Sequence, residues 1–593
     1  MGTQNISMAR DPESRKRFLQ HILHDIEAVE RMEAEGMFEI GVTRIGAEQE
    51  FCLIDKYCKP SRHGLEVLQR VDDPHFNSEL ARYNLEINLD PVELRGACFK
   101  QVETQLRDLL DHAEHAAAEI GERILLTGIL PSIDLRAVQM SYITPRPRYR
   151  ALADVISGIR GQDFELNING VDELILRHGN IMFEACNTSF QCHYQIQPDA
   201  FADSYNWAQM VSGPVLSVCA NSPLLLGRQL WAETRIALFQ QSIDTRGTGL
   251  HLREKEQRVT FGNRWIEGIS DVYRNDVARY TLFFLTDIET NSLDVLDAGG
   301  IPSLAALQLH NGTIYKWNRP CYGVTGGVPH LRIENRYLPS GPTVADEMAN
   351  FMFWTGLMSN LPDGFRGRWA EHSFADAKEN FYKAAMWGVQ SGMVWEGEMV
   401  PARTLVLETL LPLAREGLEK VGIDAQDIDR GLGVIRRRAE GHATGARWLV
   451  KGFRTLREGC SREETVVALT ALLDKRRRGG RPVHEWEPAD ASELDELEFQ
   501  YDVVGNVMST DLVTVSDGDL AVLVRRVMEW RGIHHILVED LRGELQGLIT
   551  RKHLDRMLAR PDFDPLAVAA DVMVSDPVTI TPDADIKFAM LLM

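Results

Sequence analysis

Several features that would assign a function directly are missing from this chain of 593 residues. Its eight cysteines are scattered and none forms a C-x-x-C pair, so a disulfide framework is not expected. No apolar run reaches eighteen residues, and we therefore expect no membrane-spanning helix. The first sixteen residues are polar and do not contain the apolar segment of a secretory signal. These absences predict a cytoplasmic protein with reduced thiols.

The chain also has fewer basic than acidic residues. The chain has 64 Lys and Arg against 86 Asp and Glu, a net charge of −22 at pH 7, which argues against a nucleic-acid binder. There is no G-x-x-x-x-G-K-[ST] phosphate loop and no dinucleotide fingerprint. A nucleotide site is still compatible with this composition, because phosphate charge is usually met locally by metal, Arg and Lys.

Hydrophobic periodicity divides the chain into regions. Helical spacing predicts helices over residues 15–36, 344–359, 401–421 and 461–473. Ser461 and Glu464 have the spacing of a capping box at the start of the last of these helices. Between residues 41 and 338, helical stretches alternate with short segments of period two. The basic run 475–478 is interpreted as a surface helix end, and with the acidic stretch after it predicts a charged linker over residues 475–500.

The last hundred residues contain an internal repeat. Residues 506–514 align without gaps on residues 571–579, an offset of 65 residues, and such a fixed period indicates a duplicated unit. The first copy has the pattern of helix, strand, turn, strand and helix, with G-I-H-H-I-L-V at 532–538 and G-L-I-T at 547–550. The second copy stops at its helix, so we expect it to be incomplete.

Four short segments have strand periodicity and carry charge or strong polarity on one face only. Side chains alternate across a strand, so residues two apart share a face. The polar positions are Glu48 and Glu50; Glu86 and Asn88; His193 with Gln191, Gln195 and Gln197; and Arg332, Glu334 and Arg336. Each segment alone fits a sheet with one solvated face. Together, their wealth of Glu, His, Gln and Arg favours a shared site.

The residue types of this polar face indicate a metal. Several carboxylates facing one cavity raise one another's pKa, and bound cations remove that cost. Glutamate oxygens with little nitrogen ligation suit Mg²⁺ or Mn²⁺ better than zinc. Because Mg²⁺ typically bridges substrate phosphates, the pattern points to phosphoryl chemistry.

The first polar segment, G-A-E-Q-E-F at residues 46–51, resembles the G-x-E-x-E-F opening of glutamate–cysteine ligases and related bacterial carboxylate–amine ligases. Further segments resemble this family in the same order along the chain: N-L-E-I-N (84–88), a His-bearing segment (187–195), A-N-S-P-L (220–224), E-T-R (233–235) and R-I-E-N-R (332–336). One such motif is weakly specific, whereas six in the right order are much more so.

The resemblance implies an α+β fold, with a glutamine-synthetase-like antiparallel sheet funnel and surrounding helices. It implies an ATP- and Mg²⁺-dependent ligase in which a carboxylate, glutamate in the best-known members, becomes an acyl phosphate that an amine then attacks. The partners would be small molecules, an amino acid and an amine, as in glutathione biosynthesis. We expect the catalytic core over residues 1–345 and a helical extension over 346–474, followed by the linker.

The resemblance also assigns roles to residues. Arg336 would neutralise the transferring phosphoryl group, with Glu334 and Glu48 as its catalytic partners. Arg235 would clamp a substrate carboxylate, although a helix-surface arginine is an equal alternative. The metal ligands would be Glu48, Glu50, Glu79, Glu86, His193 and Glu334, with Glu79 the weakest candidate. Residues beside the nucleotide would be Lys316, Trp317, Arg319 and Gln195, although Trp317 also fits simple packing.

The repeated segment at residues 501–593 resembles a tandem CBS-domain module, a small α/β unit that often binds AMP or ATP between its copies. His553 occupies the position where that family often carries a ribose-binding Asp. A folding or dimerisation element without ligand is the alternative, and a homo-oligomer is left open.

Two other functions compete with the ligase. One is a metal-dependent amide hydrolase on the same fold, and the other is an inactive nucleotide-sensing regulator. The sequence favours an active enzyme over the regulator, because no expected acidic position carries an apolar residue. The departures, Gln49 and Asn335, are polar and point to the opposite face of their strands.

Overall fold

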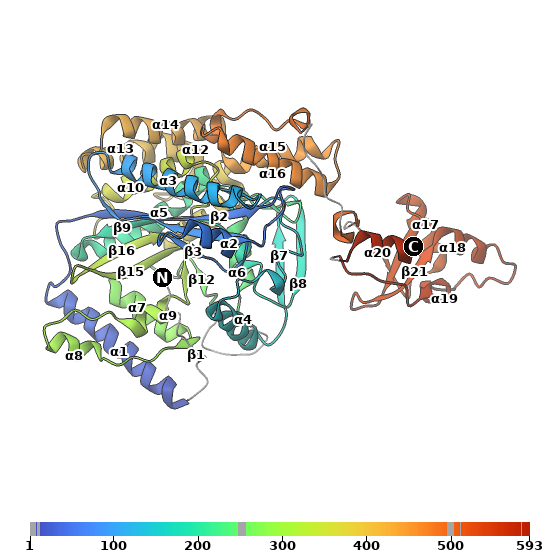
Figure 1. The fold of residues 1–593 in the computed structure, drawn as a ribbon, viewed down its shortest axis with the longest axis horizontal. Helices are drawn as coiled ribbons and strands as arrows, with labels where there is room; N and C mark the ends of the chain where they lie inside the picture. Colours follow the sequence, from blue (N-terminus) through green and yellow to red (C-terminus); the bar gives the residue numbers. More distant parts are fainter. Residues whose placement is uncertain (1–6, 9–11, 247–255, 495–502, 510–511, 583) are drawn as a thin grey trace. The chain divides into compact units, whose positions relative to one another are not determined.

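Two separate units are present in the computed structural model, Met1–Glu498 and Phe499–Met593 (Figure 1). The structure describes residues 7–8, 12–246, 256–494, 503–509, 512–582 and 584–593. Within these ranges no helix is both long and apolar enough to cross a membrane.

An eight-stranded antiparallel sheet is the centre of the first unit. Its strand order is β15–β16–β9–β2–β4–β3, and β5 and β6 also pair with β2. The strands are β2 (Arg44–Ile54), β3 (Phe76–Ser78), β4 (Asn84–Asn88), β5 (Val92–Glu93), β6 (Arg123–Leu125), β9 (Phe190–Ile196), β15 (Asn318–Thr325) and β16 (Val328–Asn335). The four segments predicted from period-two alternation form β2, β4, β9 and β16, so the expected antiparallel sheet is confirmed.

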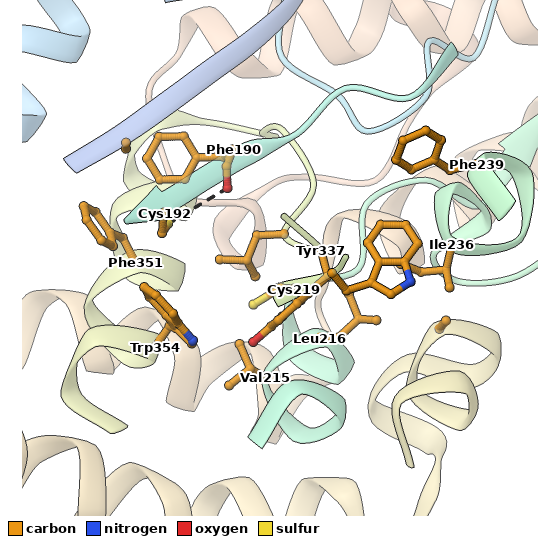
Figure 2. Packing of buried hydrophobic residues seen from close by; sticks show 14 of the residues in the cluster. Phe190, Cys192, Val215, Leu216, Cys219, Ile236, Phe239, Tyr337, Phe351 and Trp354 are labelled. Carbon is orange, nitrogen blue, oxygen red and sulfur yellow. Dashed lines mark hydrogen bonds between the residues drawn. The ribbon is translucent and has the colours of Figure 1, made fainter. Parts of the chain in front are cut away.

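Helices α3 (Cys98–Ala118), α5 (Phe201–Cys219) and α10 (Val344–Ser359) cover the apolar face of this sheet. The ring of Phe190 on β9 lies 6.1 Å from that of Phe351 on α10, and the ring of Tyr194 lies 6.2 Å from that of Trp354. Figure 2 shows Phe190 and Cys192 of β9 beside Phe351 and Trp354 of α10. Burying an aromatic side chain of this kind contributes roughly 1.5–3 kcal/mol, so the alternating apolar positions fix which face of the sheet is covered.

Further helices lie on both sides of the sheet (Figure 1). Beyond α10 lie α13 (Leu411–Lys420), α14 (Ala425–Gly441), α15 (Gly445–Arg457) and α16 (Arg462–Arg478), and on the opposite side lie α1 (Pro12–Ala34), α7 (Ile269–Arg279), α8 (Ser292–Asp297) and α9 (Ala305–Asn311). The remaining longer elements are α2 (Gly64–Val71), α4 (Pro147–Arg160), α6 (Thr234–Ser242), α11 (Phe374–Trp387), β7 (Phe164–Asn169) and β8 (Glu173–His178). The predicted helices are confirmed, including the capping box of Ser461 and Glu464.

The basic run after residue 474 is the last turn of α16, as expected for a helix end. Arg477 and Arg478 form ion pairs with Glu114, and Arg476 forms one with Glu493. The chain then returns along the first unit, where Val483, Trp486 and Ala489 are buried. The end of the expected linker, residues 495–500, lies outside the described residues. Within its described part, the region 475–494 is therefore mostly exposed but anchored to the first unit by these three buried side chains.

The second unit has a four-stranded sheet of order β19–β20–β21–β22. Its elements are β19 (Thr514–Ser516), α17 (Ala521–Trp530), β20 (His535–Glu539), β21 (Leu545–Thr550), α18 (Arg551–Leu558), α19 (Ala569–Val572), β22 (Val574–Ser575) and α20 (Ile586–Leu592). The core includes Val524, Met528, Ile536, Ile549 and Leu554. The predicted order of helix, strand, turn, strand and helix in the first copy is confirmed.

A buried ion pair joins the helices outside the sheet to α10. The Oδ1 atom of Asp346 lies 2.7 Å from the Nη2 atom of Arg438 on α14, and both side chains are at most 2% exposed. The same carboxylate accepts the backbone N–H of Val483, and Arg438 also donates to the Oδ1 atom of Asn350 at 2.6 Å. This pair therefore ties α14 and the segment after α16 to the helix that packs on the sheet.

We expect Asp346→Asn to lower the free energy of unfolding by about 3–5 kcal/mol, because it leaves the Arg438 charge buried without a counterion. Urea unfolding followed by intrinsic fluorescence measures the loss. The matched control is Asp429→Asn, which removes the carboxylate of the exposed pair with Arg415 and should cost less than about 1 kcal/mol. Equal losses in the two variants would contradict the anchoring role of Asp346.

Candidate active site

The strand register brings the polar side chains of neighbouring strands together. Arg319 pairs with Glu334, Glu334 with His193, Glu48 with Asn88 and Glu50 with Glu86. Residues directly opposite one another on neighbouring strands project from the same face of the sheet. Arginine, glutamate and histidine side chains from β15, β16, β9, β2 and β4 therefore line one continuous face, opposite the face that α10 covers.

Arginines hold the carboxylate at the β15–β16 end of this face. The Oε2 atom of Glu334 accepts hydrogen bonds from Arg319 at 3.1 Å and 2.7 Å, and Oε1 accepts one from Arg336. Cys321 lies on the same face, with its Sγ atom 3.2 Å from Oε2. Burial raises the pKa of Glu334, but the charges of Arg319 and Arg336 outweigh it and hold the pKa well below its usual range. Glu334 is therefore a buried, ionised carboxylate.

His193 lies in the middle of the face, between Glu48 and Arg332. Its Nε2 atom is 3.1 Å from the Oε1 atom of Glu48, and its Nδ1 atom is 3.3 Å from the Nε atom of Arg332. Burial raises the pKa of Glu48. The hydrogen bond and charge of His193 lower this pKa by more than burial raises it, so the net shift is downward. Glu48 is therefore also ionised at neutral pH.

Carboxylates crowd together at the other end of the face. Glu50 accepts hydrogen bonds from the backbone N–H and hydroxyl of Ser189 and from Gln191. Burial and the charges of Glu48 and Glu50 raise the pKa of Glu86 to about 8. Burial, Glu86 and Glu50 likewise raise the pKa of Glu79 well above its usual value. The acidic end thus holds more negative charge than its protein neighbours compensate.

The chemistry of this donor set fits a divalent cation. A hexacoordinate Mg²⁺ with bonds of about 2.1 Å places neighbouring ligand atoms about 3 Å apart. A hydrogen bond of 3.1 Å joins Glu48 Oε1 to His193 Nε2, so a cation that binds both atoms would replace it. In the side-chain positions of the described residues, no three His, Cys, Asp or Glu groups converge on one metal position. Cation binding at Glu48 and His193 would therefore require side-chain rotations around them.

Four further candidates are held by protein partners. Arg235 is 3% exposed, and its guanidinium donates to Glu233 and to the backbone carbonyls of Arg336 and Tyr337. Lys316 forms a buried ion pair with Asp276 on α7 at 2.6 Å. The remaining two are Trp317, whose ring packs between Phe239 and Phe381, and Gln195, which bonds to Glu39 and Arg44. Of these four, only Gln195 shares the polar face of Glu48 and Glu334.

Glu184 is a member of the acidic end that the sequence pattern did not indicate. It begins the 3₁₀ turn Glu184–Cys186 just before β9, and burial with the charge of Glu50 raises its pKa to about 7. Period-two alternation could not identify Glu184, because side chains in a 3₁₀ turn do not alternate between two faces as they do in a strand. The available signal was a lone glutamate between the apolar residues Phe183 and Ala185.

Comparison with protein families gives two matches. The family model described as glutamate-cysteine ligase family 2 matches residues 44–468, and the model of the CBS domain matches residues 504–560. The first match spans the whole polar face and the helices beyond α10. No curated protein sequence matches the chain.

Solved structures are similar at low sequence identity. Glutamate–cysteine ligase from Francisella tularensis in complex with AMP is 12% identical, with a TM-score of 0.48 over 78% of this chain and 92% of that one. A bifunctional glutathione synthetase from Pasteurella multocida is 12% identical, with a TM-score of 0.43 over 77% and 55%. The complex of the ubiquitin-like protein Pup with its ligase PafA is 10% identical, with a TM-score of 0.31 over 72% of each chain.

The raised pKa of Glu86 predicts a pH-dependent stability. Folding raises this pKa from its usual value near 4.5 to about 8, so the folded protein binds the proton more tightly and loses stability as pH rises between these values. Glu86→Gln removes this loss. The thermal midpoint of the variant, relative to the wild type, should therefore be higher at about pH 8 than at about pH 5.

Mn²⁺ should raise the thermal midpoint of the wild type more at about pH 8 than at about pH 5, because cations bind ionised carboxylates. Differential scanning fluorimetry at both pH values measures both effects. The control, Glu93→Gln, changes a glutamate of β5 whose side chain is 43% exposed and should follow the wild type. A midpoint difference between Glu86→Gln and the wild type that does not change with pH would refute the shared-charge account.

Proposed function

Since the chain belongs to glutamate-cysteine ligase family 2 and is an ATP-dependent carboxylate–amine ligase, we propose that it joins the γ-carboxylate of glutamate to an amine through an acyl phosphate. The observation that carries this proposal is the single polar face, on which ionised Glu48 and Glu334 lie beside Arg319 and Arg336. Carboxylates that hold cations and arginines that neutralise anionic oxygens are the two requirements of phosphoryl transfer.

In this proposal Glu48, Glu50, Glu86, His193 and Glu334 hold Mg²⁺ or Mn²⁺, with Glu79 and Glu184 at the margin of the acidic end. The cations would supply charge neutralisation for ATP and for the phosphoryl group in transfer. Arg336 and Arg319 would bind anionic oxygens from the other end of the face. Their guanidinium groups already contact Glu334, so they are positioned beside the proposed cation site.

Arg235 is assigned a supporting role instead of direct substrate contact. Its side chain is buried and donates to the carbonyls of Arg336 and Tyr337, and a substrate carboxylate would have to displace these bonds. Holding this backbone fixes the start of the Arg336 side chain. Lys316 and Trp317 are left out of the nucleotide site for the same reason, since Asp276 and neighbouring aromatic rings already occupy them.

Mg²⁺-dependent phosphate release from ATP tests the function. Glutamate and each of a panel of amines are supplied together, singly or not at all. Release that needs both substrates supports the ligase and identifies the amine. Amide cleavage without ATP would favour the hydrolase, and nucleotide binding without release under any pairing would favour the regulator.

Replacing a proposed cation ligand should remove most of this activity. We expect Glu48→Gln and Glu334→Gln each to lower the rate of phosphate release by more than about 100-fold, since even indirect supports of a metal site contribute 10–100-fold. The isosteric change removes the negative charge and keeps the side-chain volume. Glu93→Gln serves again as the control and should change the rate less than about twofold. Full turnover in either ligand variant would exclude its metal role.

The CBS unit is proposed to bind AMP or ATP. A hollow of about 460 Å³ lies along α18 and is lined by His534, Arg551, Lys552, Asp555, Arg556 and Ala559. Three of these side chains are cationic, which suits a phosphate group.

The eight cysteines, all unpaired, support our placement of the enzyme in the reducing cytoplasm.

We expect Arg556→Gln to weaken AMP binding by about tenfold, because it removes one charged hydrogen-bond donor from the hollow. Titration of the full chain with AMP, followed by calorimetry, measures the change. Arg560→Gln alters an exposed arginine outside the hollow and is the matched control. Equal affinity in the wild type and both variants would place any AMP site elsewhere.

A further inference from the structure

Gln49 is a buried glutamine to which the proposed reaction assigns no role. It lies on β2 between Glu48 and Glu50, and its side chain points to the covered face of the sheet, the face that also carries Ala47 and Phe51. Gln49 is 0% exposed. A polar side chain in such a place costs free energy unless its hydrogen bonds are made, so its partners indicate what it does.

Both donor hydrogens of the Gln49 amide are used. Its Nε2 atom donates to the backbone carbonyl of Glu50 at 2.7 Å and to the Oγ atom of Ser340 at 2.9 Å. Ser340 lies 291 residues later in the chain and is also fully buried. The second bond therefore joins β2 to the segment that follows β16.

That segment begins with Arg336, the first residue after β16, and Ser340 is held within it at three places. Its N–H donates to the carbonyl of Thr188 at 3.2 Å. Its own carbonyl accepts a hydrogen bond from the side chain of Asn221 at 2.8 Å, and its hydroxyl accepts the bond from Gln49. Because all three polar groups are bonded, a shift of β2 is passed directly to the segment.

The two residues just before β9 connect the same segment to the polar face. The backbone N–H and hydroxyl of Ser189 donate to the Oε2 atom of Glu50 at 2.6 Å and 2.9 Å. Its neighbour Thr188 accepts the N–H of Ser340. A proposed cation ligand and the segment that carries the arginine are therefore joined on both faces of the sheet.

The distance between these groups matters for the proposed reaction. Since β9 lies between β2 and β16, the two strands are about 10 Å apart. The cations and Arg336 would act on the same phosphoryl group, and a displacement of about 1 Å in such a site can lower a rate by about 100-fold. Arg336 lies just beyond the paired residues of β16, so its position depends also on the segment after it.

We propose that Gln49 is a positioning residue, which through Ser340 holds Arg336 at a fixed distance from the proposed cation ligands of β2. This inference rests on the proposed function, in which those ligands and the arginine act together on the phosphoryl group. It goes further by assigning a part in the reaction to a side chain on the covered face of the sheet.

The test measures phosphate release by the full chain with ATP, Mg²⁺ and the substrate pair that supports turnover. Gln49→Met keeps the shape of the side chain and removes both donors. We expect kcat to fall by about tenfold while the KM for ATP changes less than about twofold, because the loss is in the transition state and not in substrate binding. The thermal midpoint should change little, since an apolar side chain of the same shape fills the site.

Asn206→Leu is the matched control. Asn206 on α5 is also a fully buried amide, but its side chain bonds only to the backbone of Ile266, at 2.8 Å and 3.0 Å. This variant should lower the thermal midpoint and leave kcat unchanged, the result that a purely structural amide gives. The same result for Gln49→Met would overturn the inference.

Ser340→Ala removes the other partner of the same bond and should lower kcat to the same extent. In the double variant the loss should equal that of either single variant, because both remove one interaction. Losses that multiply, or an unchanged kcat in Ser340→Ala, would overturn the inference. If Gln49→Met does not fold, Ser340→Ala decides alone. These negative results in a chain that turns over leave the proposed function intact, whereas a wild type without turnover would overturn both.

Discussion

The structure of the first unit depends on how charge is neutralised on one side of an antiparallel sheet. Alternation turns every second side chain of the strands toward α3, α5 and α10; on β9, Phe190 and Tyr194 meet Phe351 and Trp354 of α10. The other half carries glutamates that cannot be packed in the same way, because a buried carboxylate without a partner is costly. Arg319 and Arg336 meet that cost for Glu334. Among the described residues, no arginine or lysine forms an ion pair with Glu79 or Glu86, whose pKa values are raised.

Period-two alternation predicted the side chains that β2, β4, β9 and β16 contribute to the polar face. Glu48, Glu50, Glu86, His193 and Glu334 all follow from parity, because the side-chain direction in a strand is fixed by sequence position. Contacts between distant elements could not be predicted in this way. The pairing of Lys316 with Asp276 joins a strand to a helix 40 residues earlier, and Glu184 reaches the face from a 3₁₀ turn. Neither leaves a periodic trace in the sequence.

Local sequence patterns predicted the helices well, whereas average composition predicted the region after α16 less well. Apolar spacing located α10, and apolar spacing with the capping box of Ser461 and Glu464 located α16, since these signals act within a few residues. The charged stretch that follows has the composition of a solvated linker, yet Val483, Trp486 and Ala489 are buried within it. Three apolar positions, and the bond of one backbone N–H to the ion-paired Asp346, are enough to hold the segment. The average charge of a segment does not indicate which single apolar residues within it are buried.

The arrangement of charge along the face bears on the choice among functions. A cation-assisted hydrolase needs carboxylates and one activated water. Its reaction does not require two arginines such as Arg319 and Arg336 at the other end of the polar face. A regulator derived from an enzyme would tolerate loss of the acidic positions, yet every polar-face position that the family resemblance assigns to an acid is still a glutamate. A ligase that handles phosphate needs both ends, because negative charge moves from ATP to the acyl phosphate and then to free phosphate. The row from Glu86 through His193 to Arg319 provides cation-holding and anion-holding groups on one rigid sheet.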